Sequence, residues 1–293
     1  MDVLTRPNDM QATSRNWRIQ GHRIGVVPTM GYLHEGHLSL VRLARERTDR
    51  VIVTLFVNPT QFGPAEDFSS YPRNLDRDLD LCRAEGVDIV FAPEPSAMYQ
   101  PDASVIVNED RLSRGLCGAS RPGHFQGVLT VVAKLFNLTL PDLAVFGEKD
   151  AQQLRLIRRM VRDLNFPVEL LAGPILREPD GLAMSSRNVR LTPDQRAQAT
   201  CLYRMLQHAR LLVAQGEVTP RNLAHALKKL LAEAPLAELD YLEWVDNETL
   251  DPVERIDRPT LLALAVRFGE VRLIDNTVLV PQRVKQGDDR PLA

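Results

Sequence analysis

The stretch VVPTMGYLHEGHLSL, residues 26–40, decides the fold of this chain. An apolar run over residues 24–27 precedes Pro28 and predicts a short buried strand that ends there. From His37 onward the apolar residues recur at three- and four-residue steps, which is typical of a helix. Where a strand leads through a glycine-containing turn into a helix, the free backbone N–H groups and the positive end of the helix dipole point to the same place. The stretch therefore predicts an anion site.

His34 and His37 lie three residues apart at the predicted helix entrance, so both rings can act on one ligand. Gly31 and Gly36 match the glycine spacing of a P-loop, but His37 and Leu38 stand where that motif needs a lysine and a hydroxyl. We therefore reject a P-loop. Zinc ligation lacks nearby cysteines and a convincing third ligand. Two polar histidines on an ordinary helix start are the structural alternative. The His-x-Gly-His spacing favours a functional site, because it resembles the first signature of the nucleotidyltransferase superfamily, in which both imidazoles bind ATP phosphates.

The composition is that of a soluble globular protein, since 44% of the 293 residues are hydrophobic and 25% are charged. The formal net charge of −2 gives no basic field that would recruit nucleic acid or an anionic membrane, so we expect neither partner. Cys82, Cys117 and Cys201 are scattered, which argues against a disulfide framework and fits a reducing compartment. No signal-peptide core precedes Arg23 and no apolar run reaches membrane-spanning length, so we expect a cytoplasmic protein.

Apolar runs alternate with helical patterns over residues 1–176. Strands are predicted over residues 24–27, 51–57, 87–91, 143–146 and 168–172. Helices are predicted over residues 36–47, 74–85, 128–138 and 150–165, whereas residues 93–127 are rich in turns. Almost continuous apolar strands are typical of a parallel sheet. We therefore predict an α/β fold, a doubly wound Rossmann-like parallel sheet whose ligands bind at the carboxyl ends of the strands.

Polar residues with chemical potential follow two of these strands at that edge. Gln61 is either a solvated loop amide or a donor and acceptor that holds a small polar substrate. Asp150 and Gln153 have a structural explanation as the cap and capping-box residues of the next helix. Lys149 has no such explanation, and a lysine at this edge is well placed to meet phosphate. The run RPGHF, residues 121–125, is either a loop anion contact or a turn.

A second, smaller α+β domain is predicted over residues 177–282, with a polar tail at residues 283–293. Thr192 and Gln195 predict a capping box in front of a helix that runs to Gln215. A further helix and three strands are predicted over residues 219–234, 239–245, 261–267 and 271–274.

Ser185, Ser186 and Arg187 follow a glycine-containing turn near the start of this domain. Alone, the three residues are best interpreted as a solvated loop. Together with the upstream His-x-Gly-His they resemble the second superfamily signature, a Met-Ser loop with a basic residue that closes over the pyrophosphate end of ATP.

Ordered motifs extend this resemblance to nearly the whole chain. They are PTMG at 28–31, HEGH at 34–37, FVNPTQF at 56–62, YPR at 71–73, RPGHF at 121–125, GEKDAQQ at 147–153 and GLAMSSRN at 181–188. In this order they resemble the pantoate–β-alanine ligase family. The resemblance implies a nucleotide-binding domain over residues 1–176, a C-terminal lid domain and a homodimer. It also implies ATP as a substrate, with Mg²⁺ carried on its phosphates.

The resemblance also implies the site residues. The implied ATP contacts are Met30, Gly31, Tyr32, Leu33, His34, Glu35, Gly36, His37, Gly147, Glu148, Lys149, Asp150, Leu176, Met184, Ser185, Ser186 and Arg187. Among these, the implied catalytic residues are His37, His34, Lys149, Ser185, Ser186 and Arg187. Gln61 and Gln153 are implied to hold pantoate, with Gln61 also next to β-alanine, and no protein metal site is implied. Val189 and Arg190 depart from the basic–aromatic pair that often follows in this family.

The implied reaction joins pantoate to β-alanine through a pantoyl adenylate and releases pyrophosphate and AMP. The attacking carboxylate is already ionised at neutral pH, so the site needs alignment and charge neutralisation, not a general base. The alternatives are another small-molecule nucleotidyltransferase of this superfamily and a non-catalytic nucleotide-binding sensor. A relative that charges RNA is disfavoured by the near-neutral charge.

Overall fold

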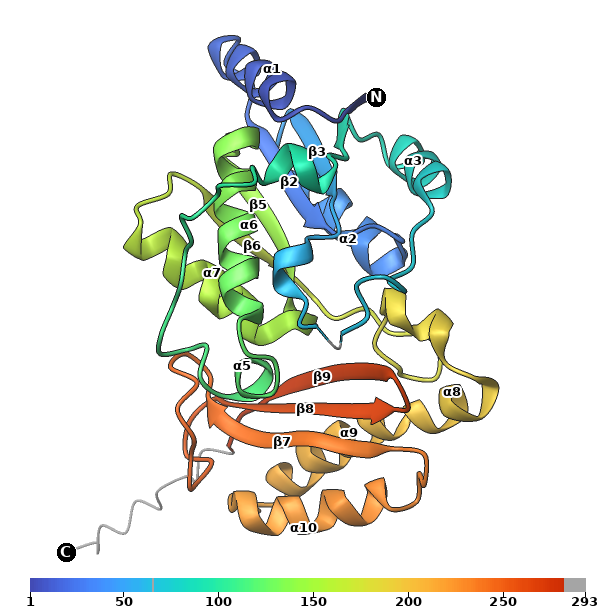
Figure 1. Cartoon of the computed structure of the whole chain (residues 1–293). Helices are drawn as coiled ribbons and strands as arrows, with labels where there is room; N and C mark the ends of the chain where they lie inside the picture. The colour runs from blue at the N-terminus through green and yellow to red at the C-terminus, as the bar shows by residue number, and fades with distance from the viewer. Residues whose placement is uncertain (65, 282–293) are drawn as a thin grey trace, which may run out of the picture.

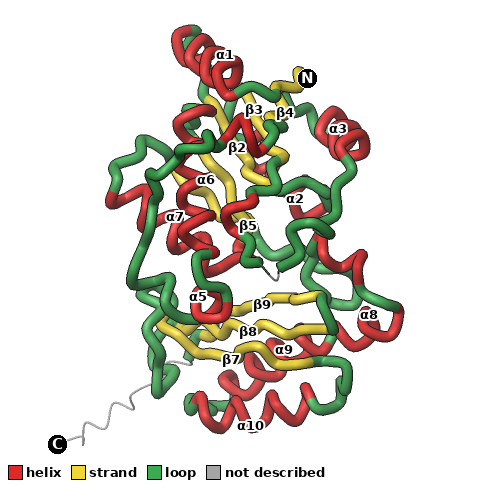
Figure 2. Tube along the Cα trace, viewed as in Figure 1, coloured by secondary structure: helices red, strands yellow, loops and turns green. Residues whose placement is uncertain are grey.

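Two sheets organise the computed structural model, which describes residues 1–64 and 66–281. A parallel sheet of six strands occupies one end of the molecule, and an antiparallel sheet of three strands lies across its other end (Figure 1; strands are yellow in Figure 2). The predicted α/β class with a smaller α+β part is confirmed by this architecture. The predicted tail at residues 283–293 lies outside the described residues.

The parallel sheet has the strand order β1-β4-β3-β2-β5-β6. Its strands are β1 (Asp2–Leu4), β2 (Ile24–Thr29), β3 (Arg50–Leu55), β4 (Ile89–Phe91), β5 (Leu143–Gly147) and β6 (Glu169–Gly173). All the pairings between these strands are parallel, as the continuous apolar runs predict. Strand β1 was not predicted, because its three residues are largely exposed and show no apolar run.

Both faces of this sheet are buried, and successive residues serve opposite faces. Val26 and Ile52 pack into one hydrophobic cluster, whereas their neighbours Val27 and Val53 pack into another. Helices α1 (Pro7–Ile19), α6 (His124–Thr139) and α7 (Ala151–Asp163) contribute to the first cluster. Helices α2 (Glu35–Arg45) and α3 (Leu75–Ala84) contribute to the second. The sheet is therefore doubly wound, with helices on both sides.

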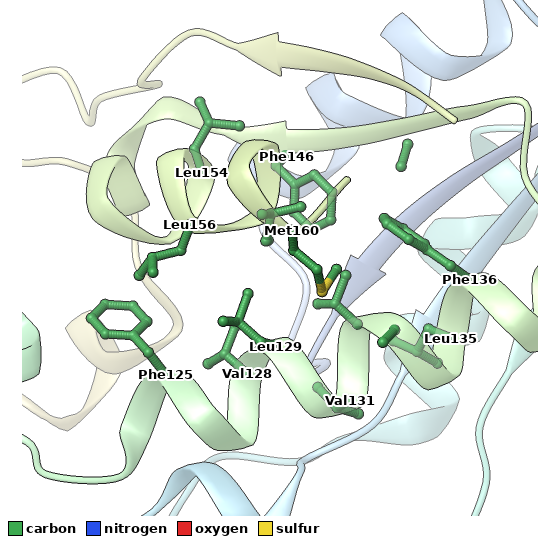
Figure 3. Close-up of a cluster of buried hydrophobic side chains, with 14 of the residues drawn as sticks. Phe125, Val128, Leu129, Val131, Leu135, Phe136, Phe146, Leu154, Leu156 and Met160 are labelled. Carbon is green, nitrogen blue, oxygen red and sulfur yellow. The ribbon is translucent and has the colours of Figure 1, made fainter. Parts of the chain in front are cut away.

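Helix α6 contributes more buried residues than the other helices of this sheet. Figure 3 shows Phe125 and Leu129 of α6 directed toward Leu156 and Met160 of α7, with Phe146 of β5 beside them. These side chains are at most 5% exposed. At about 1.5–3 kcal/mol for each large apolar side chain, their burial fixes α6 and α7 firmly against the sheet. The first turn of each helix is thereby held at the carboxyl edge, next to the candidate site.

The chain reverses its winding between β2 and β5. Strands β3 and β4 extend the sheet on one side of β2, and β5 and β6 extend it on the other. Ligands of doubly wound sheets bind in the crevice at such a switch point, beyond the carboxyl ends of the strands. His34 follows β2 and Lys149 follows β5, so the topology brings these two residues to one crevice.

The second sheet has the order β7-β8-β9 and is antiparallel throughout. Its strands are β7 (Glu238–Asp246), β8 (Thr260–Phe268) and β9 (Val271–Leu279), and its helices are α8 (Pro193–Ala199), α9 (Cys201–Ala214) and α10 (Pro220–Leu231). The capping box of Thr192 and Gln195 is confirmed, with hydrogen bonds of 3.0 and 3.3 Å. The prediction of one helix to Gln215 was wrong, because the helix is interrupted at Thr200 between α8 and α9.

Three other predictions need correction. The first strand does not end at Pro28, because Pro28 pairs with Thr54 within β2. Pairing of β2 with β5 stops at Val26. Pro28, which has no backbone N–H, is therefore tolerated because it has no partner on the β5 side. Strand β9 runs beyond the predicted 271–274. The turn-rich segment before α6 contains two short helices, α4 (Pro95–Met98) and α5 (Leu116–Ser120).

The two parts of the chain share part of their core. Val245, Leu250, Leu261 and Ala263 from the C-terminal sheet and its loops belong to the same hydrophobic cluster as α6 and α7. A separate cluster of apolar residues in the C-terminal part surrounds α9, α10 and one face of the sheet. The C-terminal sheet is therefore joined to the parallel-sheet part by an apolar contact as well as by the chain.

Candidate functional site

Two adjoining cavities lie at the carboxyl edge of the parallel sheet. The inner cavity encloses about 200 Å³, and the outer cavity, between this edge and the C-terminal sheet, encloses about 840 Å³. The residues that line both are Lys149, Asp150, Gln153, Ser185 and Arg187. These five residues come from the loop after β5, from the start of α7 and from the loop before α8, so the cavities meet where three segments converge.

Most of the predicted site residues line the inner cavity. They are Met30, His34, Gly36, His37, Gln61, Gly147, Lys149, Asp150, Gln153, Leu176, Met184, Ser185, Ser186 and Arg187. Gly31, Tyr32, Leu33, Glu35 and Glu148 do not line it. The Leu33 side chain is fully buried in the core, and Glu35 forms an ion pair with Arg42 on the surface of α2. These last two side chains serve the local fold of the turn and helix.

The two histidines stand together at the start of α2. Their rings are stacked, with centroids 4.0 Å apart and an interplanar angle of 30°. A Cβ at Gly36 would lie 2.9 Å from two atoms of the His34 ring, so only glycine leaves room for this stack. The glycine of the His-x-Gly-His motif therefore has a direct steric reason.

Hydrogen bonding fixes the proton on His37. The backbone N–H of His34 donates to Nδ1 of His37 at 3.3 Å. Because Nδ1 accepts, the neutral ring carries its proton on Nε2, which becomes a donor. Burial, the neighbouring His34 and the positive charge of Lys149 hold the pKa of His37 well below its usual value. Burial and Lys149 likewise lower the pKa of His34 to about 4. Both rings are neutral at pH 7 before an anion binds.

A buried carboxylate shapes the turn in front of these histidines. Both oxygens of Asp78 on α3 accept backbone N–H groups, from Tyr32 at 2.6 Å and from Leu33 at 2.8 Å. Gly31 and Tyr32 both have positive φ angles in this turn, at 83° and 50°. The paired N–H groups offset part of the cost of the left-handed Tyr32. Asp78 was not predicted, because a single carboxylate on an amphipathic helix carries no local signal.

The orientation of the Gln61 amide follows from its neighbour Asn58. Nδ2 of Asn58 donates to the Gly127 carbonyl and to Oε1 of Gln61, each at 3.1 Å. A backbone N–H, that of Thr60, donates to Oδ1 of Asn58, which leaves no ambiguity about which Asn58 atom is the donor. Oε1 of Gln61 is therefore occupied, and its Nε2 is directed to the Met30 sulfur, 3.2 Å away at the inner cavity. Gln61 thus presents donors to a ligand oxygen.

The capping explanation for Asp150 and Gln153 was wrong. Asp150 occupies the cap position of α7 but makes no side-chain capping hydrogen bond, and no capping box forms. Both side chains instead line the two cavities. The loop that carries them is held from the C-terminal sheet, where Nδ2 of Asn276 donates to the carbonyl oxygens of Glu148 and Lys149. Asn276 was also missed by sequence reasoning.

The serine loop, residues 185–190 in front of α8, is tied to both sides of the site. Ser186 Oγ donates to the Tyr32 carbonyl at 3.1 Å, and Ser185 Oγ accepts the backbone N–H of Arg187. Arg187 forms a two-point ion pair with Asp67, with both N–O distances 2.9 Å. Arg190 also reaches Asp67, at 2.5 Å. The serine loop therefore lies over the cavity in an anchored position.

Residues 121–125, the RPGHF run, contact the backbone of Gln61. Arg121 and His124 line the outer cavity, and both reach the Gln61 backbone carbonyl. Arg121 is also paired with Glu66 through two N–O contacts of 2.7 and 2.6 Å. Of the two interpretations that the sequence left open, an anion contact or a turn, the structure favours the turn, whose side chains bond Glu66 and the Gln61 carbonyl.

Within the described residues, no helix is long and apolar enough to cross a membrane. The same part of the chain contains no cluster of three or more His, Cys, Asp or Glu side chains arranged for a metal ion.

Comparisons with known proteins show the family to which the chain is similar. A family model described as pantoate-beta-alanine ligase matches residues 2–278. The pantothenate synthetase of Thermotoga neapolitana is 54% identical, covering 95% of this chain and 100% of the relative, and that of Geobacter sulfurreducens is 53% identical, covering 95% and 99%. The crystal structure of pantothenate synthetase from Thermus thermophilus superposes with a TM-score of 0.90 at 45% identity, covering 96% of this chain and all of that chain. A pantoate-beta-alanine ligase from Francisella tularensis, complexed with beta-gamma ATP and β-alanine, has a TM-score of 0.80 at 34% identity, covering 95% and 97%.

Proposed function

We propose, because the chain belongs to the pantoate–β-alanine ligase family, that its two cavities carry out the two steps of that family's reaction. The chain is an enzyme of this family, and its overall reaction joins pantoate and β-alanine at the expense of ATP. One observation carries the assignment of the site. The phosphate-binding candidates His37, Lys149 and Ser185 line the same cavity as the neutral amides Gln61 and Gln153.

In the first step, the pantoate carboxylate attacks the α-phosphorus of ATP. A P–O bond forms, the bond to the pyrophosphate breaks, and pyrophosphate leaves with the electron pair. Nε2–H of His37, the Lys149 ammonium and the Ser185 hydroxyl stabilise the negative charge that develops on the phosphates. The N–H groups of Gln61 and the amide of Gln153 hold the oxygens of pantoate in line for attack.

A magnesium ion carried by ATP would fit at Asp150. This carboxylate lines both cavities and is not used for capping. Mg²⁺ binds through one or two carboxylates, phosphate oxygens and water, without a full protein cage. The ion would supply charge neutralisation to the phosphates, and Asp150 is the residue that would hold it.

In the second step, the free amine of β-alanine attacks the carbonyl carbon of pantoyl adenylate. A C–N bond forms, the C–O bond to AMP breaks, the attacking nitrogen loses a proton to the departing phosphate or to water, and pantothenate is released. Acyl adenylates hydrolyse readily, so the site must exclude water between the steps. The serine loop and the C-terminal sheet cover the site, and the Arg177–Asp275 ion pair, at 2.6 Å with Asp275 almost fully buried, supports this cover.

Three further assignments complete the proposal. Residues 1–176 form the ATP- and pantoate-binding domain and residues 177–282 form the lid domain. The shared apolar contact between them favours small adjustments of the lid over a wide opening. We also propose a homodimer that works in the cytoplasm.

The test is a product analysis with ATP, Mg²⁺, pantoate and β-alanine. We expect AMP and pantothenate in equal amounts, and no AMP when pantoate is omitted. ADP and phosphate as products would contradict the proposal, because they report attack at the γ-phosphorus. A Lys149→Ala variant should lose most activity, whereas Lys228→Ala, on the exposed face of α10, should keep it.

A further inference from the structure

His124 lies behind Gln61, at the start of α6, and its side chain is only 9% exposed. Its Nδ1 is 2.9 Å from the carbonyl oxygen of Gln61, and its Nε2 is 2.9 Å from Nη1 of Arg121. His124 does not line the inner cavity, which Gln61 does. Gln61 therefore lies between the His124 imidazole and a ligand in the inner cavity.

The two partners fix the tautomer of His124. A guanidinium can only donate hydrogen bonds, so Nε2 of His124 accepts from Arg121. The proton is then on Nδ1, and Nδ1–H donates to the Gln61 carbonyl, which can only accept. Both partners require the same tautomer. Burial and the charge of Arg121 lower the pKa of His124 to about 4, which keeps the ring neutral at pH 7.

Arg121 is itself held in place. Its guanidinium forms the two-point ion pair with Glu66 through Nε and Nη2, and the same Nη2 also approaches the Gln61 carbonyl at 3.4 Å. The Arg121 side chain is 12% exposed. The planar guanidinium bonds both carboxylate oxygens of Glu66 and the His124 ring through three separate nitrogens, whereas a lysine has a single nitrogen for all these contacts.

The first turn of α6 also restrains the Gln61 loop by direct packing. Gly127 approaches the loop so closely that a Cβ there would overlap the carbonyl of Thr60 and the backbone nitrogen of Gln61. The loop helix η1 (Pro59–Gln61) is therefore pressed against α6 at Gly127 and bonded to it through His124. With its backbone fixed in this way, Gln61 keeps its amide in the orientation that Asn58 sets.

We infer that Arg121 and His124 are positioning residues for pantoate, which hold the Gln61 carbonyl so that the Gln61 amide presents its N–H donors to the substrate. This inference rests on the proposed function. It makes His124 act through Gln61, so its loss should affect the use of pantoate and leave the use of ATP unchanged.

Substitution by asparagine or by glutamine tests the roles of the two ring nitrogens of His124 one at a time. The side-chain nitrogen of asparagine can occupy the place of Nδ1, and that of glutamine the place of Nε2. His124→Asn should keep the bond to Gln61, and His124→Gln should lose it. The readout is pantoate-dependent exchange of labelled pyrophosphate into ATP, with KM measured separately for pantoate and ATP. His225→Gln on the exposed face of α10 is the matched control.

We expect His124→Gln to raise the pantoate KM by about 10–100-fold, because a buried carbonyl loses its donor, and His124→Asn to stay within about threefold of the unaltered protein. The ATP KM should be unchanged in both. Equal effects of the two variants on pantoate KM, or an equal rise in ATP KM, would overturn the inference. If His124→Gln does not fold, Arg121→Lys takes its place, and an unchanged pantoate KM in that variant would overturn it. Absence of pantoate-dependent exchange in the unaltered protein would instead overturn the proposed function, and this inference with it.

Discussion

Nδ2 of Asn276, on the last strand of the C-terminal sheet, donates a hydrogen bond of 2.9 Å to the carbonyl oxygen of Lys149. The same nitrogen donates to the preceding carbonyl, that of Glu148, at 3.0 Å. Asn276 is 7% exposed, so water does not compete strongly for these bonds. The C-terminal sheet therefore sets the backbone from which the Lys149 ammonium reaches the cavity.

Asn276→Asp tests this coupling with almost no change of shape. The substitution replaces two N–H donors by acceptors that face two carbonyl oxygens. We expect turnover to fall by about 10–100-fold, corresponding to the loss of buried donors, with little change in the circular dichroism spectrum. Asn16→Asp, on an exposed part of α1, is the control. Wild-type turnover in Asn276→Asp would show that Lys149 does not depend on this contact.

His37 should act as a hydrogen-bond donor through Nε2. His37→Ala removes that donor and should lower turnover by about 10²–10³-fold, as the removal of one preorganised donor does in other enzymes. His37→Gln places an N–H near the position of Nε2 and should recover part of the loss. Steady-state kinetics of both variants, with His225→Ala as the control, give the comparison. If His37→Gln is no better than His37→Ala, the Nε2–H assignment is wrong.

The Gln153→Glu variant distinguishes a role of Gln153 in pantoate binding from a role in folding. Because no capping box forms at the start of α7, the substitution should leave the melting temperature unchanged. The new carboxylate would repel the anionic pantoate and would lack the donor of the amide, so we expect a large rise in pantoate KM. An unchanged pantoate KM would return Gln153 to a purely structural role.

The pH dependence of the free energy of unfolding should reveal the protonation of His124. Burial, together with Arg121, lowers its pKa to about 4 in the folded protein, against an ordinary value of 6.5. The unfolded chain therefore binds more protons between these two values, and the free energy of unfolding falls as pH drops from about 6.5 to about 4. At about 1.4 kcal/mol for each pKa unit, this residue accounts for a loss of about 3 kcal/mol.

His124→Asn removes that protonation while keeping the bond to Gln61. Its free energy of unfolding, measured by denaturant titration, should fall less steeply than that of the unaltered protein over this pH range. Parallel curves for the two proteins would contradict the assignment. Glu66 and Arg121 face His124 in both proteins, and part of the difference between the two curves comes from Glu66, because His124 helps to lower the pKa of Glu66.

The strands of the parallel sheet other than β1 could be predicted because each is an apolar run whose alternate residues fill two cores. The start of α2 was equally clear, since the glycine turn and the two histidines are adjacent in sequence. The helix α1 was missed because only Met10 and Ser14 are buried in it, which leaves no apolar stripe to detect. The break at Thr200 was missed because residues on both sides continue a helical pattern.

The residues that position the site were harder to find than the residues that line it. Asn276 and Lys149 are 127 positions apart, and nothing in the sequence near Asn276 distinguishes it from other strand amides. The assignment of Asp150 and Gln153 as capping residues failed for a related reason. A capping box is a local pattern, and the fold uses the same residues at the cavity instead.

The most direct test of the account is the exchange of labelled pyrophosphate into ATP without β-alanine. Described residues that line the cavities offer no serine or cysteine activated by a base, so the acyl group should be held as a mixed anhydride with AMP. That anhydride needs only ATP, Mg²⁺ and pantoate, and its formation is reversible while pyrophosphate is present. The account predicts that label enters ATP under these conditions and that Lys149→Ala suppresses the exchange together with overall turnover. Label that enters ATP only after β-alanine is added would contradict the two-step order.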